Sequence, residues 1–207
     1  MYDLILKGGE VFDGTGVECF NGDVAIKDGV IVAVEQAGKI NHYEAEQVVN
    51  VAGLVVSPGF IDMHTHSDFT LIADGRAESQ VHQGVTTEVI GQCGASCAPV
   101  NSKEDIRRVA PWFTAAAKHE TWLGFGDYLD VLDSTELGVN VMAFVGHGTI
   151  HRAVVGGDLH AGEPDDVTTM AKLVDKCLYR VGAQSRSFLT CAPLHSQVRQ
   201  ILVGTIH

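Results

Sequence analysis

Residues 59–66 read Gly-Phe-Ile-Asp-Met-His-Thr-His, and a β-branched run that begins at Leu54 leads into them. In an extended chain, residues i and i+2 point to the same side of the strand. We therefore expect the side chains of His64 and His66 to face the same way at the end of a strand. Neutral imidazole nitrogens are common ligands of divalent metals, so this pair is a candidate metal site.

A third candidate ligand follows the next apolar run. Residues 85–90 read Val-Thr-Thr-Glu-Val-Ile, which is typical of a strand, and Cys93 comes shortly after them. If the two strands are successive and parallel, their carboxyl ends meet at one edge of the sheet, where the ligand sites of such folds gather. We therefore expect Cys93 to join His64 and His66 as a metal ligand.

The five cysteines are scattered and odd in number, a pattern that does not indicate a disulfide framework. Cys97 lies close enough to Cys93 in sequence to offer a second thiolate. A single-ligand role for Cys93 is favoured, because no second cysteine pair is present to complete a zinc knuckle.

The composition is that of an acidic chain with enough apolar residues for a core. Its 207 residues include 14 basic and 26 acidic side chains, for a formal net charge of -12, and 45% are hydrophobic. Nucleic-acid surfaces depend on clustered Lys and Arg, so no nucleic-acid partner is expected. No apolar run reaches the roughly 18 to 20 residues that span a bilayer, and the N-terminus lacks the order of a signal peptide. We expect a cytoplasmic protein without a membrane partner; its oligomeric state stays open.

Residues 1–55 alternate short strand-like runs with glycine turns. Gly8-Gly9 predicts a turn between two short strands. Asp28-Gly29 predicts a hairpin, because this dipeptide tolerates the positive φ angles of tight turns. We expect a small β-sandwich domain here.

From residue 56 the pattern changes to strands alternating with helices. Ser102 followed by Asp105 is typical of a helix N-cap. The expected helices cover residues 69–83, 125–132 and 168–178, and the expected strands cover residues 85–90 and 139–145. Such alternation indicates an α/β fold with a parallel sheet and right-handed crossovers.

His147 directly follows the strand expected over residues 139–145, which places it at the same carboxyl edge as the candidate ligands. It is a candidate residue of the substrate pocket, or a residue that orients a metal ligand without binding the metal itself. A structural histidine with a backbone partner is an equal alternative. Trp112 and Trp122 are candidates for a pocket wall, although packing in the core is favoured for both.

Three segments resemble a known family. Residues 58–66, from Pro58 to His66, resemble the first-strand signature of the amidohydrolase superfamily. Residues 84–94 with Ala98-Pro99, and residues 145–150, resemble its N-acyl-D-amino-acid deacylase (D-aminoacylase) subgroup, and the match extends to about residue 178. The resemblance implies a partial (β/α)8, or TIM-like, barrel over residues 56–207, preceded by the N-terminal part of a β-sandwich composite domain over residues 1–55. Strands from beyond the barrel complete that sandwich in the family.

The resemblance also implies a chemistry. A zinc ion is expected to be held tightly by Cys93 and two later histidines, with His64 and His66 forming a second, weaker metal position. The enzyme would hydrolyse the amide bond of an N-acyl-D-amino acid to a carboxylate and a D-amino acid. The aspartate that carries the proton is expected beyond residue 207.

Alternatives remain open. A complete barrel of this kind takes roughly 250 residues, and only about 150 follow the sandwich strands, so the chain is expected to be incomplete. A cyclic-amide hydrolase of the dihydroorotase or hydantoinase type would need a metal-bridging modified lysine on the fourth strand, and no lysine follows Lys176. A truncated metal-binding product without turnover is the non-enzymatic alternative.

Overall fold

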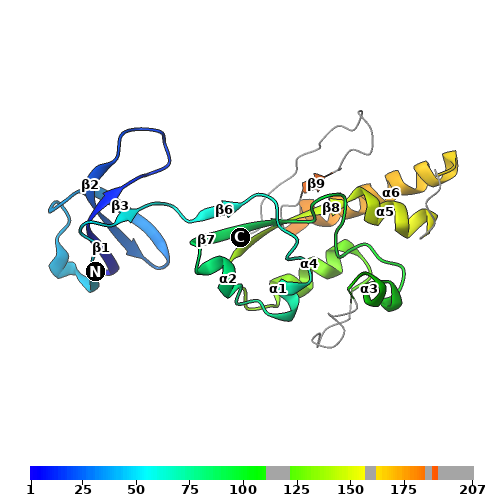
Figure 1. Cartoon of the computed structure of the whole chain (residues 1–207), viewed down its shortest axis with the longest axis horizontal. Helices are drawn as coiled ribbons and strands as arrows, with labels where there is room; N and C mark the ends of the chain where they lie inside the picture. The colour runs from blue at the N-terminus through cyan, green and yellow to red at the C-terminus, as the bar shows by residue number, and fades with distance from the viewer. Residues whose placement is uncertain (111–121, 157–161, 185–187, 191–207) are drawn as a thin grey trace. The chain divides into compact units, whose positions relative to one another are not determined.

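The computed structural model describes residues 1–110, 122–156, 162–184 and 188–190 (Figure 1). The chain divides into two compact units, Met1–Gly59 and Phe60–His207. The division lies after strand β5 (Val55–Val56), which pairs with the first strand of the chain, whereas the boundary expected after residue 55 falls inside β5. Each unit is described by itself.

The first unit contains one mixed β-sheet. Strand β1 pairs antiparallel with β2 and parallel with both β4 and β5. Strand β3 pairs antiparallel with β2, on the edge of β2 that β1 leaves free. The elements are β1 (Tyr2–Val11), β2 (Phe20–Lys27), β3 (Val30–Gln36), η1 (His42–Glu44), β4 (Ala45–Asn50) and β5. A small core of Ile5, Ala25 and Ile40 lies against this sheet. The unit is therefore β-rich, as expected. A sandwich needs two packed sheets and this unit contains one, so the sandwich stays a prediction.

One of the two turns expected in this unit is present. Strands β2 and β3 form the predicted antiparallel hairpin, with Asp28 at φ 51° and Gly29 at φ 73°. The turn predicted at Gly8-Gly9 is wrong, because β1 continues through it. Its register against β2 shifts between Leu6 and Gly9, and Gly8 takes a φ of 75°, so the two glycines form a β-bulge instead of a turn.

Asp23 is a buried carboxylate that links three segments of the first unit. Its side chain is fully buried and accepts hydrogen bonds from the backbone N–H groups of Gly8 at 2.8 Å and Gly38 at 2.9 Å, and it lies 2.9 Å from Nε2 of His42. Burial alone raises the pKa of this carboxyl. The contacts with Gly38, His42 and Gly8 outweigh burial, so the net effect is a lowered pKa.

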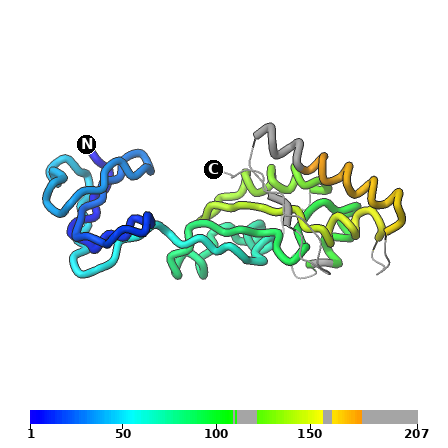
Figure 2. Tube along the Cα trace, turned by 90° about the horizontal axis from the view of Figure 1, so that it is seen from above, coloured from blue at the N-terminus to red at the C-terminus, as the bar shows by residue number. Residues whose placement is uncertain are grey.

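The second unit is α/β. Its four parallel strands lie in the order β6-β7-β8-β9, and Figure 1 shows α1, α2 and α4 along one side of the sheet. The strands are β6 (Phe60–Asp62), β7 (Val85–Ile90), β8 (Asn140–Gly146) and β9 (Phe188–Thr190). The helices are α1 (Thr70–Ala73), α2 (Glu78–Val81), α3 (Lys103–Val109), α4 (Phe125–Asp133), α5 (His147–Val155) and α6 (Pro164–Gln184). The Cα trace in Figure 2 shows this unit from a second direction. Within the described part of the chain, no helix has the length and hydrophobicity needed to cross a bilayer.

The core of this unit lies between the sheet and its helices. Trp122 is fully buried there, and its indole Nε1 donates to the backbone oxygen of Cys97 at 3.0 Å. The prediction of a packing role is therefore confirmed for Trp122, while Trp112 lies outside the described residues. The predicted N-cap is also confirmed, since the Ser102 side chain accepts from the N–H of Asp105 at 3.2 Å.

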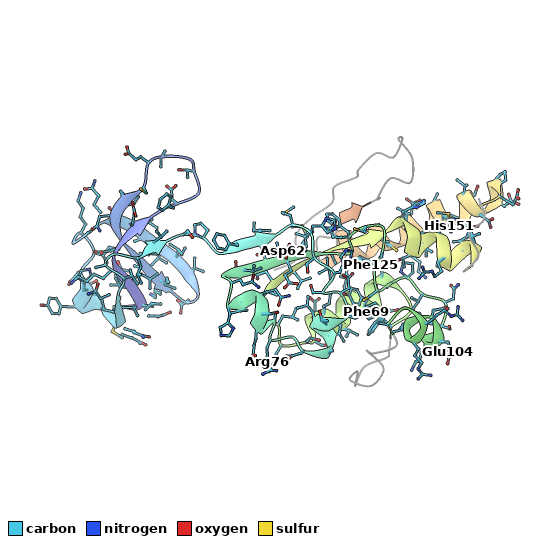
Figure 3. All side chains as sticks on the ribbon, viewed as in Figure 1. Asp62, Phe69, Arg76, Glu104, Phe125 and His151 are labelled. Atoms are coloured by element: carbon cyan, nitrogen blue, oxygen red, sulfur yellow. The ribbon has the colours of Figure 1, made fainter. Side chains whose placement is uncertain are left out.

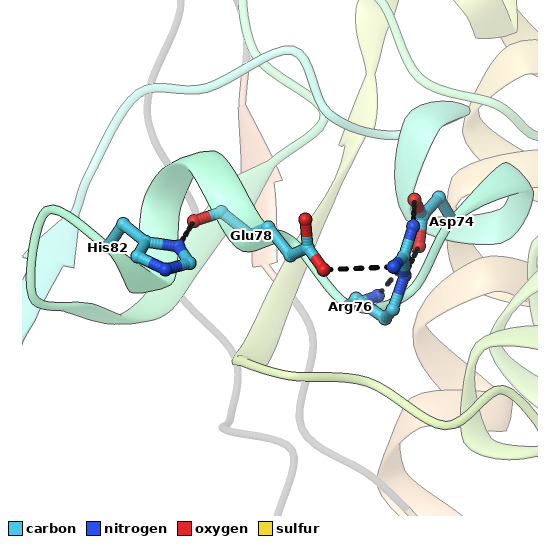
Figure 4. A network of polar contacts seen from close by, with 4 residues as sticks. All are labelled: Asp74, Arg76, Glu78 and His82. Carbon is cyan, nitrogen blue, oxygen red and sulfur yellow. Dashed lines mark hydrogen bonds and ion pairs between the residues drawn. The ribbon is translucent and has the colours of Figure 1, made fainter.

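The single helix predicted over residues 69–83 is wrong. Two four-residue helices, α1 and α2, stand in its place. Gly75 accepts a backbone hydrogen bond from Gly138 at 2.7 Å, and a Cβ at Gly75 would lie 2.4 Å from the oxygen of Glu136. The chain is therefore bent to meet another loop. Figure 4 shows how Arg76 bridges the bend through ion pairs to Asp74 at 2.7 Å and Glu78 at 2.9 Å.

Candidate metal centre

The loops that follow β6 and β7 bring three possible metal ligands together. One ligand atom from each of His64, His66 and Cys93 lies within 4.8 Å of the other two, and all three residues are exposed. Nε2 of His64 is 3.1 Å from Sγ of Cys93, and the two imidazole rings are 5.5 Å apart between centroids. The structure thus gathers the three residues expected from the sequence. Their role as ligands stays a prediction at this point.

The two histidines lie in a loop, and the expected continuous strand from Leu54 to these histidines is wrong. β5 ends at Val56 in the first unit, and β6 begins at Phe60 in the second. Pro58 falls between them, and a proline has no N–H with which to continue a ladder of hydrogen bonds. Figure 3 labels Asp62 at the end of β6, where it accepts a hydrogen bond from the N–H of His64 at 3.1 Å.

The loop nevertheless keeps the alternation of a strand. The backbone N–H of Thr65 donates to the oxygen of Val89 in β7 at 3.3 Å. This bond holds the loop beside β7, and in extended backbone the side chains of residues i and i+2, here His64 and His66, project to the same side. The two ring centroids are 5.5 Å apart, so the expectation that the imidazoles face a common side holds, although neither residue belongs to β6.

Two further side chains from the β7 segment contact this loop. Gln92 donates from Nε2 to the backbone oxygens of Met63 at 2.9 Å and Val89 at 3.2 Å, and the Ser67 hydroxyl donates to Glu88. The exposed fraction is 7% for Gln92, 5% for Ser67 and zero for Glu88. Sequence reasoning missed all three residues. The available signal was a carboxylate in the middle of an otherwise apolar and β-branched strand.

Cys93 owes its position to a tight turn after β7. Its own φ is 54°, and Gly91 and Gly94 on either side also have positive φ angles. A Cβ at Gly91 would lie 2.1 Å from the backbone oxygen of Phe144 in β8, so the turn packs directly against the neighbouring strand. A non-glycine residue with positive φ costs roughly 1 kcal/mol or more, and such strain concentrates at functional sites.

Asp68 is a buried carboxylate two residues after His66. Only 6% of it is exposed, and its Oδ1 has no hydrogen-bond partner among the described residues. Burial raises the pKa of Asp68 to about 6, although the N–H of Gly91 and the charge of His66 act in the opposite direction. Burial also raises the pKa of Glu88. Both carboxyls therefore ionise less readily than on the surface.

A pocket of about 210 Å³ lies beside one of the three donors: Cys93 is among its lining residues, whereas His64 and His66 are not. Its walls include the apolar side chains of Phe69, Val100 and Ile106, and Arg152 of α5 also lines it. Within the described residues, Arg152 makes no ion pair. Figure 3 labels Phe69, which lines this pocket, and Glu104 of α3 and His151 of α5, two helices that contribute other lining residues.

His147 does not join the donor group. It is exposed at the first position of α5, and its ring centroid lies 6.4 Å from that of His151. It is also absent from the lining of the pocket beside Cys93, to which the next two residues, Gly148 and Thr149, do contribute. A direct role in a substrate pocket stays a prediction for His147. Cys97, the other thiol considered from the sequence, is fully buried and lies outside the donor group.

Known proteins resemble this chain over most of its length. A sequence profile described as the amidohydrolase family matches residues 47–177. In Alcaligenes xylosoxydans xylosoxydans, an N-acyl-D-aspartate deacylase is 35% identical over 85% of this chain and 34% of its own length, and a D-aminoacylase is 34% identical over 86% and 36%. This chain therefore spans about a third of the length of these relatives.

Solved structures agree with these matches. A D-aminoacylase described as having a binuclear metal centre superposes with a TM-score of 0.74 at 33% identity, over 87% of this chain and 37% of that protein. An N-acyl-D-glutamate deacylase from Bordetella bronchiseptica, complexed with zinc and a phosphonate inhibitor, gives a TM-score of 0.74 at 25% identity, over 91% and 37%. The α/β fold described above is thus shared with these proteins.

Proposed function

We propose, from the premise that this chain belongs to the amidohydrolase family, that it forms part of a metal-dependent hydrolase of N-acyl-D-amino acids. The reaction releases a carboxylic acid and a D-amino acid. The observation that carries the proposal is the convergence of His64, His66 and Cys93 within 4.8 Å at the carboxyl ends of β6 and β7. Its family support is the likeness to two deacylases at about 34% identity.

The proposed fold of the complete protein follows from the same relatives. We take β6 to β9 as the first four strands of a (β/α)8 barrel, and Met1–Gly59 as part of a β-sandwich. The parallel order β6-β7-β8-β9 and the alternation with helices support the barrel. The exposed edge strand β3, with Val30 and Ile31 about 60% exposed, supports a sandwich that further strands complete.

The donor set fits zinc. Zinc prefers nitrogen and sulfur ligands, and tetrahedral zinc with ordinary bond lengths holds N and S about 3.6 Å apart, close to the 3.1 Å between His64 and Cys93. We assign Cys93 to a tight zinc position and His64 with His66 to a weaker second position beside it, close enough for the Cys93 thiolate to contact both ions. Zinc bound there would supply Lewis acidity, which polarises an amide carbonyl and makes water a better nucleophile at neutral pH.

The remaining residues of the site bind and orient the substrate. The pocket beside Cys93 has apolar walls for part of an N-acyl-D-amino acid, and Arg152 presents a positive charge to its carboxylate. The carboxylate that moves the proton is placed in a segment outside these residues. We propose a cytoplasmic enzyme without a nucleic-acid partner, in agreement with the net charge of -12.

The test uses the longest polypeptide that contains this chain, freed of metal with a chelator and then given zinc. We expect release of free amino acid from N-acetyl-D-methionine or N-acetyl-D-glutamate, little from the L-enantiomers, and none before zinc is added. Cys93→Ala is expected to abolish the release. Hydrolysis of dihydroorotate or hydantoins in place of the N-acyl substrates would overturn the proposal in favour of a cyclic-amide hydrolase. No zinc-dependent hydrolysis of either class would contradict both.

A further inference from the structure

The loop that carries the two histidines is attached to the β7 segment at three alternate positions. Gln92 donates to the backbone oxygen of Met63, the N–H of Thr65 donates to the backbone oxygen of Val89, and the hydroxyl of Ser67 donates to Glu88. We call these three hydrogen bonds the anchoring contacts. The anchored residues stand on both sides of each histidine. The same β7 segment ends in Cys93, so every anchoring contact joins the part of the chain with the two imidazoles to the part with the thiol.

We propose that Glu88 and Gln92 are positioning residues that set the separation between the two imidazoles and the thiolate, and through it the affinity and geometry of the bound metal. The inference rests on the proposed metal function of the three donors. Neither residue is assigned to the donor set, and both act through the loop backbone and the Ser67 hydroxyl.

Gln92 is placed to control the distance between His64 and Cys93. It immediately precedes Cys93, and the oxygen that it binds belongs to Met63, which immediately precedes His64. The 2.9 Å hydrogen bond therefore ties together the two peptides next to the closest pair of donors. Gln92 is only 7% exposed, so water competes poorly for this contact.

Glu88 controls the other end of the loop. It lies inside β7 opposite Asp62 of β6, and it is fully buried, so its carboxylate has little freedom to move. The Ser67 hydroxyl that it accepts belongs to the residue directly after His66. An apolar residue at position 88 would leave this buried hydroxyl without its acceptor, and the loop would shift to satisfy it.

Purely structural residues would affect folding and leave the metal geometry unchanged, so the test needs a spectroscopic readout. Cobalt(II) bound by a thiolate gives a sulfur-to-cobalt absorption band, and the visible d–d bands report the coordination geometry. The experiment titrates cobalt(II) into the metal-free, full-length protein and its variants. The measured quantities are the dissociation constant and the two sets of bands, neither of which depends on turnover.

We expect Gln92→Ala and Glu88→Ala to weaken cobalt binding about 10- to 100-fold, the usual range for residues that orient a metal ligand, and to change the d–d bands. Glu88→Gln retains a carbonyl oxygen for the Ser67 hydroxyl, so it is expected to stay within about threefold of the wild type in affinity. The matched control is Asp23→Asn, which alters an equally buried carboxylate in the first unit. It should lower stability and leave the cobalt spectrum unchanged.

Unchanged spectra and affinities in both alanine variants would overturn the inference, and so would a Glu88→Gln variant as impaired as Glu88→Ala. If Glu88→Ala does not fold, Ser67→Ala takes its place, because this variant removes the same hydrogen bond with the loss of one oxygen atom. Normal cobalt binding by Ser67→Ala would then contradict the role of Glu88. A wild-type protein that binds cobalt without the thiolate band would instead overturn the proposed metal site itself.

Discussion

Nε2 of His64 lies 3.1 Å from Sγ of Cys93, although 29 residues separate the two in the sequence. The distance permits a hydrogen bond between the two groups, and a small outward movement would permit a shared metal ion. Both side chains are exposed, so an ion can reach them from solvent. The chemistry proposed for this protein depends on this pair.

The thiols should differ in reactivity. Cys93 is exposed, whereas Cys97 is fully buried and its pKa is raised by burial. We expect iodoacetamide to label Cys93 in the metal-free protein at pH 8 at least about 100-fold faster than Cys97, because the thiolate is the nucleophile. Zinc should slow labelling of Cys93 and leave Cys97 unchanged. Peptide mass spectrometry provides the rates. A labelling rate of Cys93 that is the same with and without zinc would contradict its role as a ligand.

Gly91→Ala should destabilise the second unit. Gly91 has a φ of 78°, and an added Cβ would lie 2.1 Å from the oxygen of Phe144, so both the backbone conformation and the space oppose a side chain. We expect a loss of at least about 3 kcal/mol in the free energy of unfolding. In the control Gly156→Ala, at a φ of 96° with open space around it, only the backbone conformation opposes a side chain, so the cost should be smaller, about 1 to 3 kcal/mol. Urea unfolding followed by tryptophan fluorescence distinguishes the two variants.

Arg152→Met should weaken substrate binding more than turnover. If Arg152 receives the substrate carboxylate, its loss should raise KM about 5- to 10-fold, as expected for one partly exposed charged contact, and change kcat less than about threefold. Arg107→Met is the matched control, since Arg107 lies on α3 outside the pocket and pairs with Glu104 at 3.5 Å. Equal kinetics for the two variants would exclude Arg152 from substrate binding.

The first unit should lose stability in acid through Asp23. Its pKa in the folded protein is lowered from 3.8, so the carboxylate stabilises the fold above pH 3.8, and this contribution disappears as the pH falls through the lower folded value. Hydrogen exchange of β1 and β2 in moderate urea, corrected for the intrinsic rates, should show weaker protection at pH 3 than at pH 5. Asp23→Asn should reduce protection at pH 5 and remove most of the difference between the two pH values. An unaltered pH dependence in that variant would assign the effect to other groups.

Local patterns were sufficient where neighbouring residues decide the conformation. The strand over residues 85–90, the hairpin at Asp28-Gly29 and the cap at Ser102 are all present as predicted. Each depends on the alternation, turn preference or capping ability of a few adjacent residues. The helix predicted over residues 69–83 failed because a distant loop at Gly138 meets the chain at Gly75, a contact without a local pattern.

The same limit applies to the site. The sequence by itself singled out His64, His66 and Cys93 as candidate metal ligands, because the residue types and their spacing are local properties. Only the tertiary structure decided how far apart their donor atoms lie, that Glu88 and Gln92 anchor the histidine loop, and that His147 stays outside the donor group. The physical reason is that these relationships depend on the register between parallel strands and on the close approach of backbones, which arise only when segments distant in sequence pack together.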